Sequence, residues 1–375
     1  MKLLYVESTL AIHGGIERVL TDKLNWLVEF GKCEVLLLLV NQGNNPIVFP
    51  LNSKIDVHNI NILFYRIYRF SRIKRYYKSF KLHRLFRKRL QDNIKAFSPD
   101  VIVFTRLEFA CDVMSVKGDI PVVYESHNSY LAYKFEKYSL LHRIQIILCH
   151  RALKKVQMIV ALTNGDAIEW KKLNSHVQVI PNIVHLNDTG SYSDCINKSV
   201  IFVGRFSKQK NIGCLLRIWN VVHQRYPEWQ LHIYGGYGDE QNVLISEIEQ
   251  LNANILVHTP TSDIHKKFVE CSILLMTSRY EPFGLVLPEA MSCGLPVVAF
   301  DCPYGPADII TDGADGFLIK YEDINEYVDK VALLIEDEDL RMQMGRKGRI
   351  NAQRYDAYSI MPVWKQLFDN ILNKI

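Results

Sequence analysis

Short, uninterrupted apolar runs alternate with helical patterns along the chain, and this alternation restricts the possible folds more than any other feature. In the first half the runs lie at residues 2–8, 33–40, 100–106, 121–127, 158–163 and 177–182. In the second half they lie at residues 199–205, 229–235, 255–260, 272–278, 295–301 and 316–320. Runs that are apolar at every position are typical of parallel strands covered by helices on both faces. The sequence therefore predicts an α/β protein with two doubly wound, Rossmann-like sheets.

A polar, turn-forming stretch at residues 185–198 separates the two blocks of strands and is interpreted as a linker. We predict an N-terminal domain of residues 1–185 and a C-terminal domain of residues 186–354. The last segment, residues 355–375, is predicted to form an amphipathic helix pair that returns to the first domain. Because doubly wound sheets bind ligands at the carboxyl ends of their strands, we expect the two sheets to face a central cleft.

Composition excludes several classes of protein. With 48% hydrophobic residues and 23% charged residues, the 375-residue chain is expected to fold throughout. Its eight cysteines form no CxxC pair, which argues against a disulfide framework or a zinc site and favours a reducing cytoplasm. No secretion signal and no uncharged apolar run long enough to span a membrane is recognised, so a cytoplasmic protein is expected.

One window is strongly basic. Residues 66–89, RIYRFSRIKRYYKSFKLHRLFRKR, contain eleven Lys or Arg residues, no acid, and many aromatic side chains. A helix of this kind suits anionic lipid headgroups, so we expect peripheral association with the inner face of the cell membrane. A solvated helix with its aromatic residues in the core is the alternative. Nucleic acid also suits basic runs with aromatic residues, but no nucleic-acid module accompanies the window and no nucleic-acid partner is expected.

Motifs follow the predicted strands. Gly14 and Gly15 open a helix after the first strand, which fits a phosphate loop or a structural turn about equally well. The strand at 199–205 ends in Gly204 and Arg205, with Lys210 near the start of the next helix. A guanidinium and an ammonium at one strand end suit a diphosphate.

Two acids stand in the otherwise apolar segment SRYEPFGLVLPEAMSCGLPVVAFD, at residues 278–301. Glu289 lies in the first turn of a helix expected to begin at Pro288, where the helix dipole stabilises a carboxylate by ~0.3 to 1 kcal/mol. Glu281 follows a strand end in a loop and has no such local reason. Both acids are expected to accept hydrogen bonds from hydroxyl groups of an extended ligand, with the two cations at its charged middle. Such a ligand is a nucleotide sugar.

The segment from Glu281 to Glu289 resembles the E-x7-E signature of the retaining glycosyltransferases of family 4, which have the GT-B fold. The segments EPFGLVLPEAMSCGLPVVAFD and GRFSKQKN match the pattern of this family almost throughout. The first half matches through Gly14 and Gly15, through YESH and through IPN. Residues 301–310, DCPYGPADII, resemble a subset that builds bacterial surface glycans, including lipopolysaccharide, or lipid-linked oligosaccharides.

The resemblance implies roles in donor binding. Glu289 would bind the ribose hydroxyls, and Glu281 would contact the transferred sugar. Backbone groups of Phe283, Gly284 and Leu285 would lie against sugar and phosphate.

It also implies roles around the phosphates and the sugar. Arg205 and Lys210, after Gly204, would stabilise the leaving diphosphate. Gly14 and Gly15 would allow the backbone to approach the phosphates, and His127, in YESH, would lie near the sugar.

The sequence thus predicts a retaining glycosyltransferase that moves a hexose or N-acetylhexosamine from a nucleotide diphosphate sugar to a glycan or lipid-linked saccharide acceptor. A UDP-linked donor is favoured. No metal and no cofactor are expected. A sugar-nucleotide epimerase of the same fold is one alternative, and a non-catalytic, membrane-bound sensor of nucleotide sugars is another.

Overall fold

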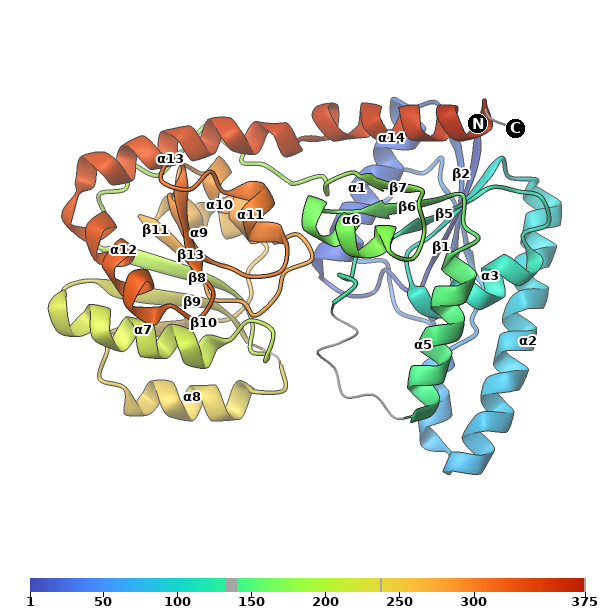
Figure 1. Cartoon of the computed structure of the whole chain (residues 1–375), viewed down its shortest axis with the longest axis horizontal. Coiled ribbons are helices and arrows are strands. Elements are labelled where there is room, and N and C mark those ends of the chain that lie inside the picture. Colours follow the sequence, from blue (N-terminus) through green and yellow to red (C-terminus); the bar gives the residue numbers. More distant parts are fainter. Residues whose placement is uncertain (132–139, 237, 374–375) are drawn as a thin grey trace. The chain divides into compact units, whose positions relative to one another are not determined.

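A computed structural model describes residues 1–131, 140–236 and 238–373, with the side chains of 72–73 and 140–142 left aside. The chain divides into two compact units (Figure 1). Unit 1 comprises Met1–Ile183 and Ala357–Ile375, and unit 2 comprises Val184–Asp356. Each unit contains a parallel sheet with helices on its faces.

The sheet of unit 1 has seven strands in the order β3-β2-β1-β4-β5-β6-β7. These are β1 (Lys2–Glu7), β2 (Glu34–Leu39), β3 (Asp56–Asn59), β4 (Val101–Phe104), β5 (Val122–Glu125), β6 (Met158–Ala161) and β7 (Val177–Val179). All pairs are parallel. The inner strands are buried along nearly their whole length, which explains their continuous apolar runs.

Helices cover both faces of this sheet. They are α1 (Gly15–Glu29), α2 (Arg72–Phe97), α3 (Ala110–Val116), α5 (Leu140–Leu153), α6 (Asn164–Lys171), α14 (Ala357–Leu372) and the 3-10 helices η1 (Phe64–Arg69) and η2 (Leu107–Phe109). Side chains of α2, α3, α5 and α6 share one core with the sheet. Side chains of α1 and α14 share the core on the opposite face.

The sheet of unit 2 has six strands in the order β10-β9-β8-β11-β12-β13. These are β8 (Ser199–Arg205), β9 (Gln230–Gly236), β10 (Ile255–His258), β11 (Ile273–Met276), β12 (Val297–Asp301) and β13 (Gly316–Lys320). The helices are α7 (Ile212–Arg225), α8 (Gln241–Gln250), α9 (Ile264–Val269), α10 (Val286–Ser292), α11 (Gly305–Ile309), α12 (Ile324–Glu336), α13 (Glu338–Ala352) and the 3-10 helix η3 (Gln353–Tyr355). Side chains of α7, α8 and α12 form one core with this sheet.

The strand order reverses once in each sheet. In unit 1 the reversal lies between β1 and β4, and in unit 2 it lies between β8 and β11. At such a switch point the loops after adjacent strands lead to opposite faces of the sheet, and this leaves a crevice at the carboxyl ends. A ligand is therefore expected at one place in each unit: the carboxyl ends of β1 and β4 in unit 1, and the carboxyl ends of β8 and β11 in unit 2.

The predicted fold, an α/β protein with two doubly wound parallel sheets, is confirmed. Strand β3 was missed because DVHN is an edge strand with little buried surface and lacks an apolar run. The predicted C-terminal helix pair is wrong: α14 is one helix that continues through Pro362. Within the described parts of the chain, none of the helices combines the length and hydropathy needed to cross a bilayer.

Helix α14 should contribute strongly to the stability of unit 1. Trp364 is 1% exposed in the core beneath it, and Nζ of Lys23 lies 3.7 Å from the centre of its ring. We expect Trp364→Ala to cost about 3–5 kcal/mol, because it leaves a cavity in that core. A lower midpoint of urea unfolding, followed by circular dichroism, would show it. Tyr358→Ala, on the same helix but 71% exposed, is the control and should leave the midpoint nearly unchanged.

Candidate functional site

Two loops of unit 2 meet at the switch point of its sheet, one after β8 and one after β11. Lys210 comes from the first loop and Glu281 from the second, and Nζ of Lys210 donates to Oε1 of Glu281 at 2.5 Å. The hydroxyl of Ser278 donates to the same oxygen at 2.6 Å. The side chains of Lys210 and Glu281 are only 15% and 6% exposed, so each charge depends on the other for its compensation.

Hydrogen bonds to backbone carbonyl oxygens hold the same two loops together. The hydroxyl of Thr277 donates to the carbonyl oxygen of Lys210 at 3.1 Å. The side-chain amide of Gln209 donates to the carbonyl oxygen of Tyr280 at 3.1 Å, and N–H of Arg279 donates to the carbonyl oxygen of Gln209 at 2.8 Å. The ion pair therefore sits on a crosslinked platform rather than on two independent loops.

Gly204 leaves space for the Lys210 side chain. A Cβ at Gly204 would lie 3.2 Å from Cγ of Lys210, closer than ordinary van der Waals contact. Arg205, the next residue, is exposed at the end of β8. Across the residues the structure describes, no carboxylate forms an ion pair with Arg205. Its guanidinium is available to an anion at the carboxyl end of β8.

The loop that carries Glu281 is fixed on its other side. N–H of Glu281 donates to the carbonyl oxygen of Pro303 at 2.7 Å, and N–H of Gly305 donates to the carbonyl oxygen of Glu281 at 3.0 Å. A Cβ at Gly305 would lie 1.7 Å from the carbonyl oxygen of Phe283, so only glycine permits this approach. Gly284 has φ +95°, a backbone conformation that also favours glycine.

The remaining predicted residues of unit 2 follow directly. The ring of Phe283 is buried and packs edge-on against Tyr355 at 5.3 Å, so only its backbone can contact a ligand. Leu285 precedes α10 and is half-buried. Glu289 is half-buried in the first turn of α10, as predicted. The helix begins at Val286, two residues before the predicted start, because the turn after Gly284 is already helical.

A second ion pair lies at the switch point of unit 1. Nε of Arg106, after β4, donates to Oε1 of Glu7, at the end of β1, at 2.9 Å. Thr105 donates to the other oxygen of Glu7, and N–H of Ser8 donates to Oε1 at 2.6 Å. Glu7 is 1% exposed, and its charge raises the pKa of Arg106. Arg106 therefore stays charged in this crevice.

His127 belongs to a buried charged cluster beside this pair. Nζ of Lys23, from α1, donates to Oε1 of Glu125, and Nε2 of His127 lies 3.2 Å from the same oxygen. Burial alone would raise the pKa of Glu125, but Lys23 and His127 lower it to about 2. Burial lowers the pKa of Lys23, and Glu125 opposes this shift. Glu125, at the carboxyl end of β5, thus lies between the Lys23 ammonium and the His127 imidazole.

Gly14 and Gly15 lie where the sequence predicts, at the start of α1. Gly14 caps the helix, and a Cβ there would lie 2.4 Å from Oε2 of Glu17. Glu17 is 5% exposed, and burial raises its pKa. Its carboxylate lies 4.0 Å from Nη2 of Arg106. Gly14 therefore makes room for a buried acid in the first turn, and this acid was not among the predicted residues.

The sequence interpretation missed several buried or half-buried polar residues of both crevices: Glu7, Glu17, Lys23, Arg106, Glu125 and Ser278. Four of them could have been found, because each is a polar residue at or just after the end of an apolar strand run: Glu7, Arg106, Glu125 and Ser278. Lys23 and Glu17 lie within a helix, and nothing in its pattern indicates which side chains reach the sheet edge.

Two family profiles match consecutive parts of the chain. The profile described as Glycosyltransferase Family 4 matches residues 13–188, and the one described as Glycosyl transferases group 1 matches residues 196–351. The chain belongs to glycosyltransferase family 4. It is therefore a transferase. The matched regions include Gly14, Gly15, Arg106, Lys210 and Glu281, whereas Glu7 precedes them.

Full-length relatives support this assignment. An uncharacterized glycosyltransferase of Haemophilus influenzae is 28% identical over 94% of this chain and 95% of its own length. The amylovoran biosynthesis glycosyltransferase AmsD of Erwinia amylovora is 27% identical over 98% of this chain and 99% of its own length. A role in polysaccharide biosynthesis agrees with these relatives.

Solved structures identify the fold as GT-B. A mutant of TarM from Staphylococcus aureus, in complex with fondaparinux, α-GlcNAc-glycerol and UDP, matches with a TM-score of 0.81 at 17% identity, over 98% of this chain and 100% of that one. Sucrose-phosphate synthase from Thermosynechococcus elongatus matches with a TM-score of 0.81 at 16% identity, over the whole of both chains. HepE from Anabaena, in complex with UDP, matches with a TM-score of 0.75 at 18% identity, over 99% of this chain and 100% of that one.

Removal of the Lys23 ammonium should lower the free energy of unfolding, because Glu125 would then be a buried charge without a cationic partner. We expect Lys23→Met to destabilise the protein by about 3–5 kcal/mol, because it leaves the Glu125 charge buried beside no ammonium group. Lys23→Met/Glu125→Gln should regain most of this loss, since it removes both charges. Urea unfolding at neutral pH measures both variants, and equal losses in the two would contradict the assignment.

Acid should remove the contribution of the same cluster. The folded-state pKa of Glu125 is about 2, below its ordinary value of 4.5. Its contribution to stability is therefore fully present above about pH 4.5 and is lost as the pH falls towards 2. Wild-type protein should lose more unfolding free energy over this interval than Lys23→Met/Glu125→Gln, measured in parallel titrations.

Proposed function

We propose that this protein is a retaining glycosyltransferase that moves a hexose or N-acetylhexosamine from a UDP-linked donor to a glycan or lipid-linked saccharide. The observation that carries the proposal is the Lys210–Glu281 pair beside the exposed Arg205, at the switch point of unit 2. Two cations and a carboxylate at one strand edge suit a ligand with a diphosphate next to hydroxyl groups. Two of the three structural neighbours described above contain bound UDP, and this supports UDP as the nucleotide of the donor.

In this proposal each side chain of the unit 2 site binds a different part of the donor. Arg205 and Lys210 bind the diphosphate, Glu281 accepts a hydrogen bond from a hydroxyl of the transferred sugar, and Glu289 accepts from the ribose. The free oxygen of Glu281 is the one that receives the sugar, because Oε1 already accepts from Lys210 and Ser278. The backbone around Gly284 lies against sugar and phosphate.

The reaction breaks the bond between the anomeric carbon and the phosphate oxygen. Negative charge then develops on the diphosphate, and fixed cations at this position stabilise it more in the transition state than in the ground state. The acceptor oxygen attacks from the face that the diphosphate leaves, so the configuration is retained. The departing phosphate takes the proton of the acceptor hydroxyl, and no protein base and no metal ion is required. His127, whose Nε2 lies 3.2 Å from Glu125, is proposed to contact the sugar, and Gly14 and Gly15 are proposed to admit a phosphate.

The cation pair should matter far more for turnover than for binding. We expect Arg205→Ala/Lys210→Ala to lower kcat by about 10²–10³-fold, the typical effect of removing preorganised charge from a transition state. Release of UDP from the donor selected in a screen of UDP-sugars measures it. Lys208→Ala removes a neighbouring exposed lysine and is the control. Unchanged turnover in the double variant would contradict the proposal.

Substitutions of Glu281 and Glu289 should affect different quantities. Glu281→Ala should reduce turnover more than UDP affinity, whereas Glu289→Ala should weaken UDP binding itself, by about tenfold for the loss of a charged hydrogen bond. Calorimetry with UDP and a turnover assay give the two quantities. The opposite ranking would overturn the assignment of these roles.

Two alternatives differ in what the protein does with a donor alone. An epimerase would isomerise UDP-N-acetylglucosamine without any acceptor, and a sensor would bind UDP-sugars and never turn over in the presence of lipid extract. We propose transfer because the relatives that match over the full length are named glycosyltransferases.

We further propose that α2 places the protein on an anionic membrane surface. Its exposed cations Lys74, Lys78, Lys81, Arg84 and Lys88 recur every three or four residues and so follow one face of the helix. Arg89 is not among them, because it donates to the carbonyl oxygen of Ile60. The attachment of residues 66–89 to anionic lipid, which the sequence predicts, remains a proposal.

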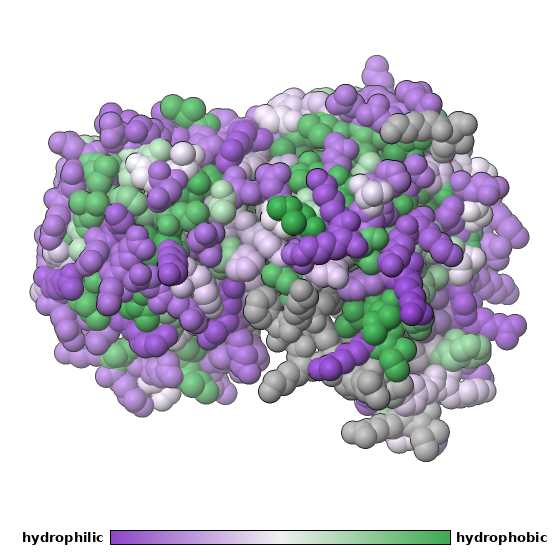
Figure 2. Space-filling view, viewed as in Figure 1, coloured by the Kyte–Doolittle hydropathy of each residue, from purple (hydrophilic) through white to green (hydrophobic). Residues whose placement is uncertain are grey.

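Apolar side chains accompany this cationic face. Tyr76, Tyr77 and Phe80 on α2 are each more than half exposed. On α5, Ile144, Ile147 and Leu148 form an exposed stripe at helical spacing. Figure 2 shows hydrophobic side chains gathered among hydrophilic ones over the region of α5. Basic residues with apolar neighbours fit the headgroup region of a bilayer.

Membrane association can be tested by sedimentation with vesicles that contain phosphatidylglycerol. Each basic residue near the surface contributes about 1 kcal/mol, so Lys78→Gln/Lys81→Gln/Lys88→Gln should weaken binding by about two orders of magnitude. Lys154→Gln/Lys155→Gln/Lys171→Gln removes three exposed lysines from other parts of unit 1 and should bind as the wild type does. Equal binding by all three proteins would exclude α2 as the membrane surface.

A further inference from the structure

Cys111 and Cys149 meet in unit 1, although 38 positions separate them in the sequence. Their Sγ atoms lie 3.8 Å apart, within hydrogen-bonding distance for two thiols. Cys111 lies in the first turn of α3, and Cys149 lies toward the C-terminal end of α5. Both helices contribute side chains to the same core, which holds the two sulfurs beside each other. Among the hydrogen bonds of the described residues, this is the one that joins two cysteines.

The two thiols differ in exposure and in acidity. All eight cysteines lie in the described parts of the chain, and Cys111 is the exposed one, whereas Cys149 is 2% exposed. The hydrogen bond to Cys111, together with burial, raises the pKa of Cys149, so that Cys149 stays a thiol and donates. The same hydrogen bond lowers the pKa of Cys111 to about 7. A substantial fraction of Cys111 is therefore thiolate at neutral pH, and the thiolate is the reactive form of cysteine.

The charges around Cys111 permit this ionisation. The carboxylate of Asp112, the next residue, opposes a thiolate. However, Nδ1 of His83 lies 2.6 Å from its Oδ2, and Nε of Arg87 lies 3.6 Å from its Oδ1. Both partners come from α2 and compensate the carboxylate, and the charge of His83 itself favours the thiolate. The surroundings of Cys111 are thus not those of an inert structural cysteine.

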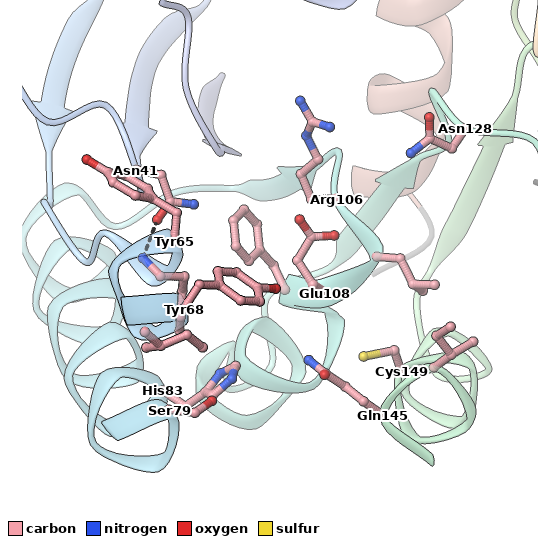
Figure 3. Close-up of a pocket in the computed structure, with 15 residues that line it drawn as sticks. Asn41, Tyr65, Tyr68, Ser79, His83, Arg106, Glu108, Asn128, Gln145 and Cys149 are labelled. Carbon is pink, nitrogen blue, oxygen red and sulfur yellow. Dashed lines mark hydrogen bonds between the residues drawn. The ribbon is translucent and has the colours of Figure 1, made fainter. Parts of the chain in front are cut away.

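The cysteine pair also joins two walls of one pocket. This pocket has a volume of about 460 Å³ (Figure 3). Cys149 and Gln145 line it from α5, and Glu108 and Phe109, which precede Cys111 in the chain, line it from η2. Figure 3 shows Cys149 and Gln145 together on the α5 side, away from Glu108. A covalent bond between the two sulfurs would fix these walls relative to each other.

We propose that Cys111 and Cys149 form a redox-sensitive modification site, in which a hydroperoxide oxidises the exposed thiol and the buried thiol then closes an intramolecular disulfide. Cys111 reacts first, because it is open to solvent while Cys149 has almost no exposed surface. In a reducing compartment such a pair rests as two thiols and forms the disulfide transiently. The site uses none of the donor-binding residues, so it goes beyond the proposed transferase function.

The reaction has two steps. The thiolate of Cys111 attacks one oxygen of the hydroperoxide and the O–O bond breaks, which leaves a sulfenic acid at Cys111 and an alkoxide or hydroxide that takes up the proton Cys111 released. Sγ of Cys149 then bonds to Sγ of Cys111, and the hydroxyl group of the sulfenic acid leaves with the Cys149 proton as water. The two sulfurs lose two electrons in total, and the peroxide gains them. Because an S–S bond is about 2.05 Å long, the sulfurs need to approach by roughly 1.8 Å.

The disulfide should change how firmly α5 is attached to the unit. From Arg143 to Leu148 the helix is largely exposed, and Cys149 is the first of its described side chains that is buried. A bond at Cys149 therefore ties the end of this exposed part to α3. Amide hydrogen exchange of residues 143–149 should be slower in the oxidised protein than in the reduced protein, because openings that separate α5 from α3 are then prevented.

Treatment with hydrogen peroxide, followed by peptide mass spectrometry without reduction, tests the site. Wild-type protein should form a crosslink between the peptides of Cys111 and Cys149, lose both thiols, and recover them with dithiothreitol. Cys111→Ser should form no crosslink and, because this residue is exposed, should keep the thermal midpoint of the wild type. Cys33→Ala removes another buried cysteine of unit 1 and is the matched control, which should form the crosslink as the wild type does.

A second measurement separates the roles of the two sulfurs. Cys149→Ala removes the hydrogen-bond donor, so the apparent pKa for alkylation of Cys111 by iodoacetamide should rise from about 7 toward the ordinary value of 9.0. In this variant a sulfenic acid at Cys111 should also persist after peroxide treatment and be trapped by dimedone, whereas in the wild type Cys149 consumes it. Cys33→Ala should behave as the wild type in both assays. Cys111→Ser keeps the test valid if the cavity left by Cys149→Ala disturbs the fold.

Three results would overturn the proposal. The first is a peroxide-induced crosslink between two chains in place of the crosslink within one chain, seen on non-reducing gels. The second is as much dimedone adduct of Cys111 in the wild type as in Cys149→Ala, and the third is equal loss of thiols in the wild type and in Cys111→Ser. None of these measurements uses turnover or UDP, so failure of the transferase proposal would leave this site standing, and the reverse also holds.

Discussion

The ion pair between Lys210 and Glu281 holds together the loops on which the candidate donor site depends. Both side chains are nearly buried, and a buried charge without its partner costs several kcal/mol. The two loops are therefore confined to arrangements in which the pair is intact. Ser278 and Thr277 at the end of β11 support the same geometry from the sheet. Arg205, at the end of β8, stays exposed beside none of the carboxylates that the described ion pairs contain.

Unit 1 repeats this design with different residues. Its switch point carries Glu7 and Arg106, again an ion pair between residues at the ends of the two strands where the order reverses. The reason is topological: neighbouring loops leave a parallel sheet in opposite directions only at this position, and the strand ends there are not covered by either loop. Polar groups at that edge must satisfy one another until a ligand arrives, and paired charges do so.

Helix α2 serves two surfaces at once. Its inner side contributes Phe86 to the core and His83 to the pocket, while its outer face carries the exposed lysines and arginines. A hydrophobic core on one side explains why so basic a segment folds into a helix at all. Helix α2 thus joins the hydrophobic core of unit 1 to an exposed basic surface.

The sequence by itself determined the two parallel sheets, because strands buried on both faces must be apolar throughout and are recognisable in isolation. It also located Gly204, Arg205, Lys210, Glu281 and Glu289, since these follow strand ends in the order of a recognisable family. Only the tertiary structure decided which polar groups meet. The partnership of Lys23 with Glu125, and of Glu7 with Arg106, joins residues about a hundred positions apart. Such contacts depend on strand order and helix rotation, which local residue patterns do not encode.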